Sequence, residues 1–299
     1  MRPQTERDYH ERMLRVLVHI QQHLDESIPL EELASVANFS PFHFHRVFRG
    51  MVGESVKGHV RRLRLERAAY RLKFGDAPVT RIAFEAGFEA HESFTRAFRA
   101  MFGQPPSQFR KVHQALRMPE ARSGVHYSPD GRVESFEVHK SGGKAMNVRV
   151  MKLQPKRVAF VRHVGPYDQV GQTWQKLMGW ASGKGMFAAM MMPIGLVHDD
   201  PEVTPPEKIR YDACLAVGED FQPEGEVGGQ TIAGGEYAVL THQGPYEKLG
   251  ESYSRLAGEW LPSSGRQFRA APGFEVYLNS PMTSPPEKLM TDIYLPLES

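Results

Sequence analysis

The chain has 299 residues, of which 40% are hydrophobic and 24% charged, and its formal net charge is +2. This length fits two domains of about 150 residues each, and this composition excludes global disorder. The longest apolar run, 186–197, has twelve residues, too few for a membrane-spanning helix of about 20.

Cys214 is the only cysteine, which excludes internal disulfides and cysteine-rich zinc sites. The N-terminus, MRPQTERDYHER, has no apolar signal core, so we expect a cytoplasmic protein without a membrane partner. The histidine pairs His19/His23 and His43/His45 lack an acidic or cysteine partner at suitable spacing. Because phosphate-loop and nucleophile motifs are also absent, we expect no metal, no cofactor and no enzyme.

Basic residues concentrate in the N-terminal third of the chain. Residues 1–113 hold 18 Lys+Arg against 13 Asp+Glu, whereas the remainder carries a net charge of −3. Nine of these basic residues, against two glutamates, fall within 46–73. Such a stretch is typical of a surface that contacts phosphates, although charge alone favours a solvated helix face equally.

A repeat occupies the same third. FHRVFRGMVG (Phe44–Gly53) recurs as FTRAFRAMFG (Phe94–Gly103), and a short helical pattern precedes each copy, over 30–39 and 80–88. The two patterns end at Asn38 and Gly87, residues that tolerate the left-handed conformation. Short helix, tight turn and second helix, used twice, predict two helix-turn-helix units.

Between the units, residues 55–73 place apolar side chains at helical spacing. A helix of this length is a rod of roughly 28 Å, and one turn of duplex DNA spans about 34 Å. Such a rod could hold two reading helices near successive major grooves.

Residues 26–111 resemble the AraC/XylS-type transcriptional regulator DNA-binding domain. ANFSPFHFHRVFRGMVG, the RxxxA pattern at Arg64–Ala68 and AGFEAHESFTRAFRAMFGQPPSQFRK carry the resemblance. It implies that the second helix of each unit enters the major groove of double-stranded DNA, with RNA polymerase as a further partner. The implied DNA-binding residues are Phe42, His45, Arg46 and Arg49 in the first unit and His91, Glu92, Arg96 and Arg99 in the second.

These residue types suit the two kinds of DNA contact. Arginine at 46 and 96 can donate twice to guanine, and Glu92 can accept from cytosine. Arg49 and Arg99, one helical turn further on, are expected to hold phosphates without reading sequence.

A second repeat fills the C-terminal half. RVAFVRHVGPYDQVGQTWQKLMG (Arg157–Gly179) recurs as EYAVLTHQGPYEKLGESYSRLAG (Glu236–Gly258), and PPEKIRYDACLAV (Pro205–Val217) recurs as PPEKLMTDIYLPL (Pro285–Leu297). Each copy reads as a strand, a Gly-Pro-Tyr turn, a helix and two strands. Two such units predict an α+β domain with a pseudo-twofold axis and a cleft between the copies.

Residues 148–299 resemble the GyrI-like effector-binding domain, on the evidence of RHVGPY, THQGPY, GFEVY and DIYLPL. We therefore expect an all-α DNA-binding domain over 1–113, a linker over 114–147 and this α+β domain over 148–299. The segment 133–139 could be an edge strand or an unrecognised part of the second domain.

Glu275 is the candidate that the second repeat singles out, because it aligns with Gly195 and lies in an apolar strand context. The resemblance also implies an acidic pocket residue here, ringed by aromatic side chains. Candidates for the ring are Tyr167, Trp174, Trp180, Tyr246, Tyr253, Trp260, Tyr277 and Tyr294. A carboxylate among aromatic rings suits a lipophilic cation.

Four alternatives stay open. Glu275 could point to solvent from its strand, or it could act as general acid or base in a small-molecule hydrolase. The C-terminal domain could instead bind protein, or be a vestige behind a structural DNA-bending head. A DNA-binding head favours a transcription regulator that senses a small effector.

Overall fold

The computed structural model describes residues 4–112, 115–142, 145–186 and 192–298, apart from the side chain of Phe42. It divides into two compact units, Met1–Gly142 and Gly143–Ser299. Within the described ranges, every helix is too short or too polar to cross a membrane.

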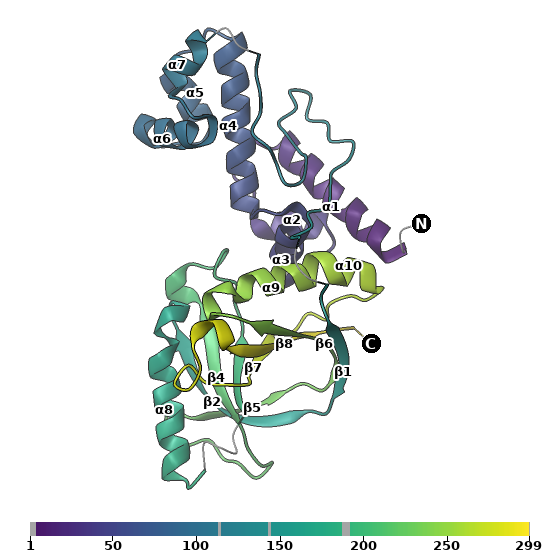
Figure 1. Ribbon diagram of the computed structural model, residues 1–299, viewed down its shortest axis with the longest axis vertical. Coiled ribbons are helices and arrows are strands. Elements are labelled where there is room, and N and C mark those ends of the chain that lie inside the picture. The colour runs from purple at the N-terminus through teal and green to yellow at the C-terminus, as the bar shows by residue number, and fades with distance from the viewer. Residues whose placement is uncertain (1–3, 113–114, 143–144, 187–191, 299) are drawn as a thin grey trace. The chain divides into compact units, whose positions relative to one another are not determined.

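The first unit is helical, as the sequence predicts (Figure 1). Its helices are α1 (Gln4–Gln22), α2 (Leu30–Val36), α3 (Pro41–Val52), α4 (Val56–Phe74), α5 (Val79–Glu85), α6 (His91–Phe102) and α7 (Pro106–Lys111). The pairs α2–α3 and α5–α6 are the two expected helix-turn-helix units, and α4 is the helix expected between them.

Both turns use the residues that the sequence indicates. Asn38 and Gly87 have φ angles of 53° and 77°, in the left-handed region. A Cβ atom on Gly87 would lie 2.6 Å from the Arg64 guanidinium, which would have to shift, and the positive φ already favours glycine there. Ser40 occupies the N-cap of α3 and Pro41 its first position, but the Ser40 hydroxyl makes no capping hydrogen bond.

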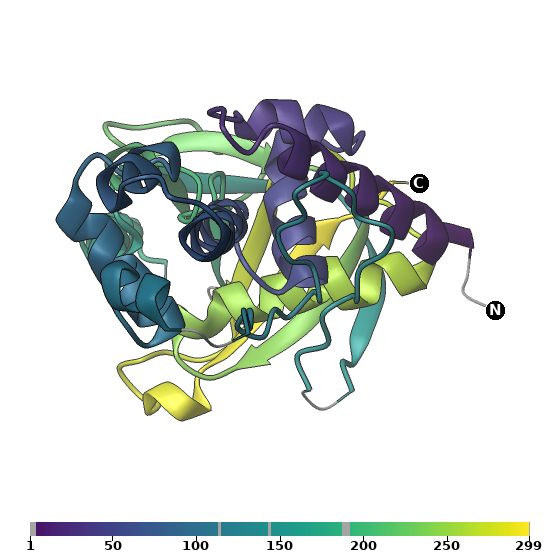
Figure 2. The same cartoon turned by 90° about the horizontal axis from the view of Figure 1, so that it is seen from above.

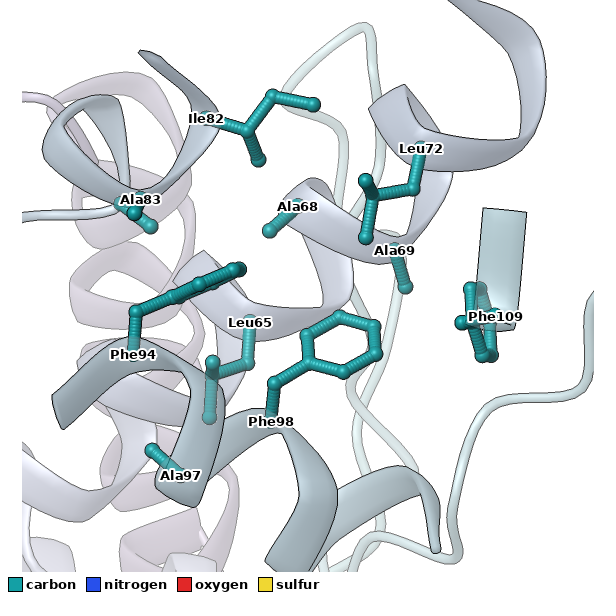
Figure 3. Packing of buried hydrophobic residues seen from close by; sticks show 11 residues of the cluster. Leu65, Ala68, Ala69, Leu72, Ile82, Ala83, Phe94, Ala97, Phe98 and Phe109 are labelled. Atoms are coloured by element: carbon teal, nitrogen blue, oxygen red, sulfur yellow. The ribbon is translucent and has the colours of Figure 1, made fainter. Parts of the chain in front are cut away.

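One apolar cluster joins the linker helix to the second helix-turn-helix unit (Figure 3). Its members are Leu65, Ala68, Ala69 and Leu72 of α4, Ile82 and Ala83 of α5, Ala86 directly after α5, Phe94, Ala97 and Phe98 of α6, and Phe109 of α7. Phe94 and Phe98 are fully buried and stack obliquely, with ring centroids 5.5 Å apart. This cluster fixes α6 against the C-terminal half of α4.

Four arginines of α4 make contacts within the first compact unit, so part of the charged stretch has a structural role. Arg62 pairs with Glu54 and Glu66, and Arg64 donates to the carbonyls of Leu24 and Glu26. Arg67 and Arg71 likewise bond to Glu85. Sequence charge alone could not show this, because carbonyl acceptors are invisible in a charge count.

Residues 115–142, expected to be most of a linker, belong to the first compact unit. Ser123, Val125 and Phe136 are buried within this segment, at 0%, 3% and 7% exposure. The possible edge strand 133–139 forms no ladder with any described strand.

The second unit is an α+β domain built on an eight-stranded antiparallel sheet. Its strands are β1 (Val148–Leu153), β2 (Lys156–Val164), β3 (Pro193–Val197), β4 (Arg210–Ala216), β5 (Gly228–Ile232), β6 (Gly235–Gln243), β7 (Gly273–Tyr277) and β8 (Met290–Pro296), in the order β1-β6-β8-β7-β3-β4-β2-β5.

The two predicted repeats are β2–helix–β3–β4 and β6–helix–β7–β8, joined at the centre of the sheet by β3 and β7. The edge strand of each repeat comes from the segment that precedes the other repeat in the chain. The strand β1 precedes the first repeat but pairs with β6 of the second, and β5 precedes the second but pairs with β2 of the first. This exchange ties the two repeats into one domain.

The helices of the repeats are α8 (Val170–Gly183) and a longer helix made of α9 (Leu249–Arg255), a π turn (Leu256–Trp260) and α10 (Leu261–Ser264). Figure 1 shows α8 alongside β2 and β4, which it contacts, and α9 contacts β6. Strand residues alternate between two apolar clusters. Tyr211, Ala213 and Leu215 of β4 pack with α8, whereas Cys214 joins the cluster on the opposite face.

Candidate functional sites

The predicted DNA-reading residues lie on α3 and α6, the second helices of the two units. On α6, Glu92, Arg96 and Arg99 are exposed, and His91 is half-buried. On α3, His45 and Arg46 are buried and Arg49 is half-buried. The Phe42 side chain lies outside the described part of the chain. A role in DNA reading stays a prediction at all eight positions.

In the second unit, Gly195 of β3 and Glu275 of β7 are register partners. They are also equivalent positions of the two repeats, at the offset of 80 residues seen in the sequence. A position that pairs with its own repeat equivalent lies on the pseudo-twofold axis. The domain therefore carries a single carboxylate at its centre of symmetry.

Glu275 is buried, with 6% of its surface exposed, so its strand does not turn it to solvent. The Tyr253 hydroxyl donates to its Oε1 at 2.9 Å, and the Tyr277 hydroxyl donates to its Oε2 at 2.6 Å. Both oxygens accept, which is the hydrogen bonding of an ionised carboxylate.

A chain of donors leads towards this carboxylate. Because the Tyr277 proton is directed at Glu275, the Tyr211 hydroxyl donates to the Tyr277 oxygen, at 2.9 Å. The Trp174 indole in turn donates to Tyr211 at 3.2 Å. Burial, and then the Glu275 charge, raise the pKa of both Tyr211 and Tyr277 well above the usual range. The phenols therefore remain donors throughout the neutral range.

Aromatic rings surround these hydroxyls. Tyr246 and Trp174 stand edge-on to Tyr277, with centroids 5.4 and 5.9 Å away, and Tyr167 stands edge-on to Tyr211 at 5.9 Å. All three are half-buried. Burial, followed by the Glu275 charge, raises the pKa of Tyr246 as well. Five of the predicted ring members are thus brought together: Tyr167, Trp174, Tyr246, Tyr253 and Tyr277.

Two predicted ring members are wrong. Trp180 lies further along α8, where it packs edge-on against Phe221 and donates to Glu224. Tyr294 alternates to the opposite face of the sheet, where it stacks on Phe274 at 4.4 Å. Trp260 belongs to the π turn, and the described contacts do not join it to Glu275. Helix and strand periodicity separates these residues from the cluster.

Tyr211 is the member that the sequence prediction missed. Its equivalent in the second repeat is Thr291, so the two copies differ here as they do at Gly195 and Glu275. The same comparison of repeats could have identified it. Its neighbours in sequence, however, resemble an ordinary buried strand.

The repeated His-x-Gly-Pro-Tyr segment is a structural turn. His163 and His242 each reach the carbonyl of the proline three residues later, at 3.0 and 3.3 Å. The intervening glycines have φ angles of 147° and 140°, which disfavour other residues. The turn starts each helix and places Tyr167 and Tyr246 beside the cluster.

Comparisons with known proteins agree with both units. Residues 146–298 match the GyrI-like small molecule binding domain, and residues 33–112 match a helix-turn-helix domain. The right origin-binding protein of Escherichia coli (strain K12) is 23% identical over 269 residues, which cover 88% of each chain.

Two further relatives match in part. The uncharacterized HTH-type transcriptional regulator YbfP of Bacillus subtilis (strain 168) is 40% identical over 128 residues, 42% of this chain and 43% of YbfP. The crystal structure of the EcmrR C-terminal domain has a TM-score of 0.42 and 20% identity, covering 52% of this chain and 98% of that chain. The chain belongs to the GyrI-like small molecule binding domain family and carries this domain behind an AraC-type helix-turn-helix domain, the composition of a DNA-binding transcription regulator.

Proposed function

We propose that the protein reads an asymmetric DNA site with α3 and α6 and that a small lipophilic cation, bound at Glu275, controls the outcome. One chain supplies two reading helices joined by the 19 residues of α4, so a monomer suffices for DNA binding. A helix of that length is comparable to one turn of duplex.

The observation that carries the effector assignment is the Glu275 cluster. The buried Glu275 carboxylate accepts hydrogen bonds from Tyr253 and Tyr277, and the charge that a ligand would most favourably place beside such an anion is positive. A cation would supply that charge, and the rings of Tyr167, Trp174 and Tyr246 would add cation–π contact. Size and charge, more than specific hydrogen bonds, would then select the effector.

Thermal stabilisation by two probes of matched shape tests the effector assignment. Tetraphenylphosphonium is cationic and tetraphenylborate anionic, while both present four phenyl rings. We expect only the cation to stabilise the second unit, by about 2.7 kcal/mol at 100 times its dissociation constant. Glu275→Gln should abolish this effect.

Glu236→Gln is the matched control, because Glu236 is a strand glutamate of the same unit that pairs with Arg266 away from the cluster. Stabilisation by the anion, or cation binding that Glu275→Gln leaves unchanged, would remove the cation from the proposal. Product analysis of the same mixtures separates binding from the hydrolase alternative. Retained DNA binding with no ligand response would favour a protein-binding or structural role.

We further propose RNA polymerase as the partner at the promoter, and a cytoplasmic location, since both follow from regulating transcription. In vitro transcription from a promoter that contains the selected DNA site tests the first. A change in transcript level that depends on the protein and on its DNA site is the expected result.

A further inference from the structure

Residues 121–139, here called the strap, follow the second helix-turn-helix unit in the chain. Within the first compact unit, the strap lies beside α1 and α4 (Figures 1 and 2). Its ordered position has to be explained, because a solvated linker would bury nothing.

The main anchor of the strap is Glu66 of α4, whose side chain is fully buried. The Tyr127 backbone N–H donates to this carboxylate at 2.7 Å, and the His126 ring nitrogen lies 3.1 Å from it. Arg62 supplies a third contact at 2.8 Å and also donates to the Val125 carbonyl. A buried carboxylate needs such partners, and the strap provides two of the three.

Arg62 continues the network to the turn between α3 and α4. It pairs with Glu54 at 2.6 Å, and Glu54 in turn bonds to the fully buried His59 at 2.8 Å. Burial alone would raise the pKa of Glu54, but hydrogen bonds from His59 and Arg62 hold it at about 2. The strap is therefore linked by charged hydrogen bonds to the start of α4.

A second anchor is the C-terminus of α3. The His139 N–H donates to the Met51 carbonyl at 2.7 Å, and Arg122 donates to the Gly53 carbonyl at 3.1 Å. Gly53 has a φ of 83°, and a Cβ atom there would lie 2.7 Å from His139 and 2.9 Å from Arg122. The strap thus closes directly over the end of a predicted reading helix.

A third anchor is α1. Gln21 is buried and donates to the His126 carbonyl at 2.7 Å. Near the other end of the strap, His10 stacks on Phe136 with centroids 4.4 Å apart. Three helices of the first unit, α1, α3 and α4, are therefore held by one segment.

The two helix-turn-helix units are attached to α4 by different means. The second packs through the apolar cluster of Figure 3, whereas the first combines direct contacts with α4, such as Phe48 against His59 and Glu54 with Arg62, with hydrogen bonds to the strap, which itself bonds to α4. Hydrogen bonds are directional, whereas apolar contact tolerates small rotations. We propose that the strap is a positioning element for DNA reading, which sets the angle and spacing of α3 relative to α6.

This proposal rests on the proposed DNA binding and concerns the geometry of the bound site. An extra base pair between two half-sites moves one of them by about 3.4 Å and rotates it by about 34°. Such an insertion should weaken DNA binding strongly when the strap holds α3 and α6 rigidly. It should weaken DNA binding less when the strap is loosened.

The experiment uses the full chain and a DNA site selected from a random library with the unaltered protein. Affinities are then measured for that site with zero, one and two base pairs inserted between the half-sites. We expect roughly tenfold weaker binding of the unaltered protein per inserted pair. Arg122→Ala and Glu66→Gln should bind the uninserted site more weakly and reduce the insertion penalty at least threefold.

Arg132→Ala is the matched control, since Arg132 is a strap arginine whose side chain is 80% exposed and forms a local ion pair with Asp130. If Glu66→Gln does not fold, Arg122→Ala decides the result. An unchanged insertion penalty in the folded variants, even with a lower melting temperature, would overturn the proposal and leave the strap a purely stabilising element. Failure of the unaltered protein to select any DNA would instead refute the proposed function.

Discussion

Gly195 and Glu275 face each other across the β3–β7 ladder, at equivalent positions of two repeats. Glycine at one position and glutamate at the other create the Glu275 cluster. A Cβ atom on Gly195 would lie 2.4 Å from the Tyr211 hydroxyl and 2.7 Å from the Tyr277 hydroxyl. The missing side chain on one strand therefore leaves room for the two phenols that lead to the carboxylate on the other.

Gly195→Ala should displace these hydroxyls from Glu275. We expect a loss of about 1–3 kcal/mol in unfolding free energy, because a buried methyl group is forced into a packed site. Cation binding should weaken in calorimetric titration. Gly171→Ala is the control, since a Cβ on Gly171 in α8 would meet nothing within 4 Å. Equal effects of the two substitutions would contradict the role given to Gly195.

Arg96 and Arg99 should affect DNA binding in different ways. Both are exposed on α6, one turn apart at its N-terminal and C-terminal parts. Arg96→Ala should cost about 1–3 kcal/mol on the selected site and much less on random DNA. Arg99→Ala should weaken both complexes similarly and reduce the salt dependence of binding. Equal losses on both DNAs for Arg96→Ala would mean that Arg96 contacts only phosphate.

The first unit should lose stability in acid. The pKa of Glu54 falls from its ordinary 4.5 to about 2, so its stabilising contribution is complete above pH 4.5 and disappears as the pH falls towards 2. A pKa shift of this size corresponds to roughly 3 kcal/mol in the free energy of unfolding. Burial lowers the pKa of His59 below 6.5, so protonation of His59 begins to destabilise the fold once the pH drops below 6.5.

Circular dichroism at 222 nm mainly follows the first unit, which holds most of the helical residues, during urea unfolding between pH 7 and 3. Fluorescence reports separately on the second unit, which contains all three tryptophans, Trp174, Trp180 and Trp260. Glu54→Gln should lower stability at pH 7 and flatten its decline in acid. The control Glu31→Gln, at an exposed position of α2, should leave the acid decline unchanged. The same slope in Glu54→Gln as in the unaltered protein would contradict this account.

Phe98→Ala should disrupt the second helix-turn-helix unit. Phe98 is fully buried between Phe94, Phe102 and Phe109, so its truncation should cost about 3–5 kcal/mol. Phe84→Ala is the control, because Phe84 on α5 is 60% exposed and its truncation should change stability by no more than about 0.5 kcal/mol. Chemical denaturation of both variants measures the difference, and a loss below about 1 kcal/mol for Phe98→Ala would show that the cluster repacks.

The sequence by itself determined the elements and their pairing into repeats. Apolar spacing, together with the left-handed residues Asn38 and Gly87, located both helix-turn-helix units. The duplicated Gly-Pro-Tyr segments located the two halves of the second unit and singled out Glu275. These features are local or repeated, so they can be read without knowing which distant residues meet.

Only the tertiary structure decided the long-range partners. The exchange of β1 and β5, the contacts of His126 and Tyr127 with Glu66, and the inclusion of Tyr211 but not Trp180 in the cluster all depend on contacts between distant segments. Register decides these contacts, because a strand or helix residue faces its partner only on one side. Local secondary-structure propensity does not determine which distant residues come into contact. Packing and the hydrogen bonds of buried charged groups do.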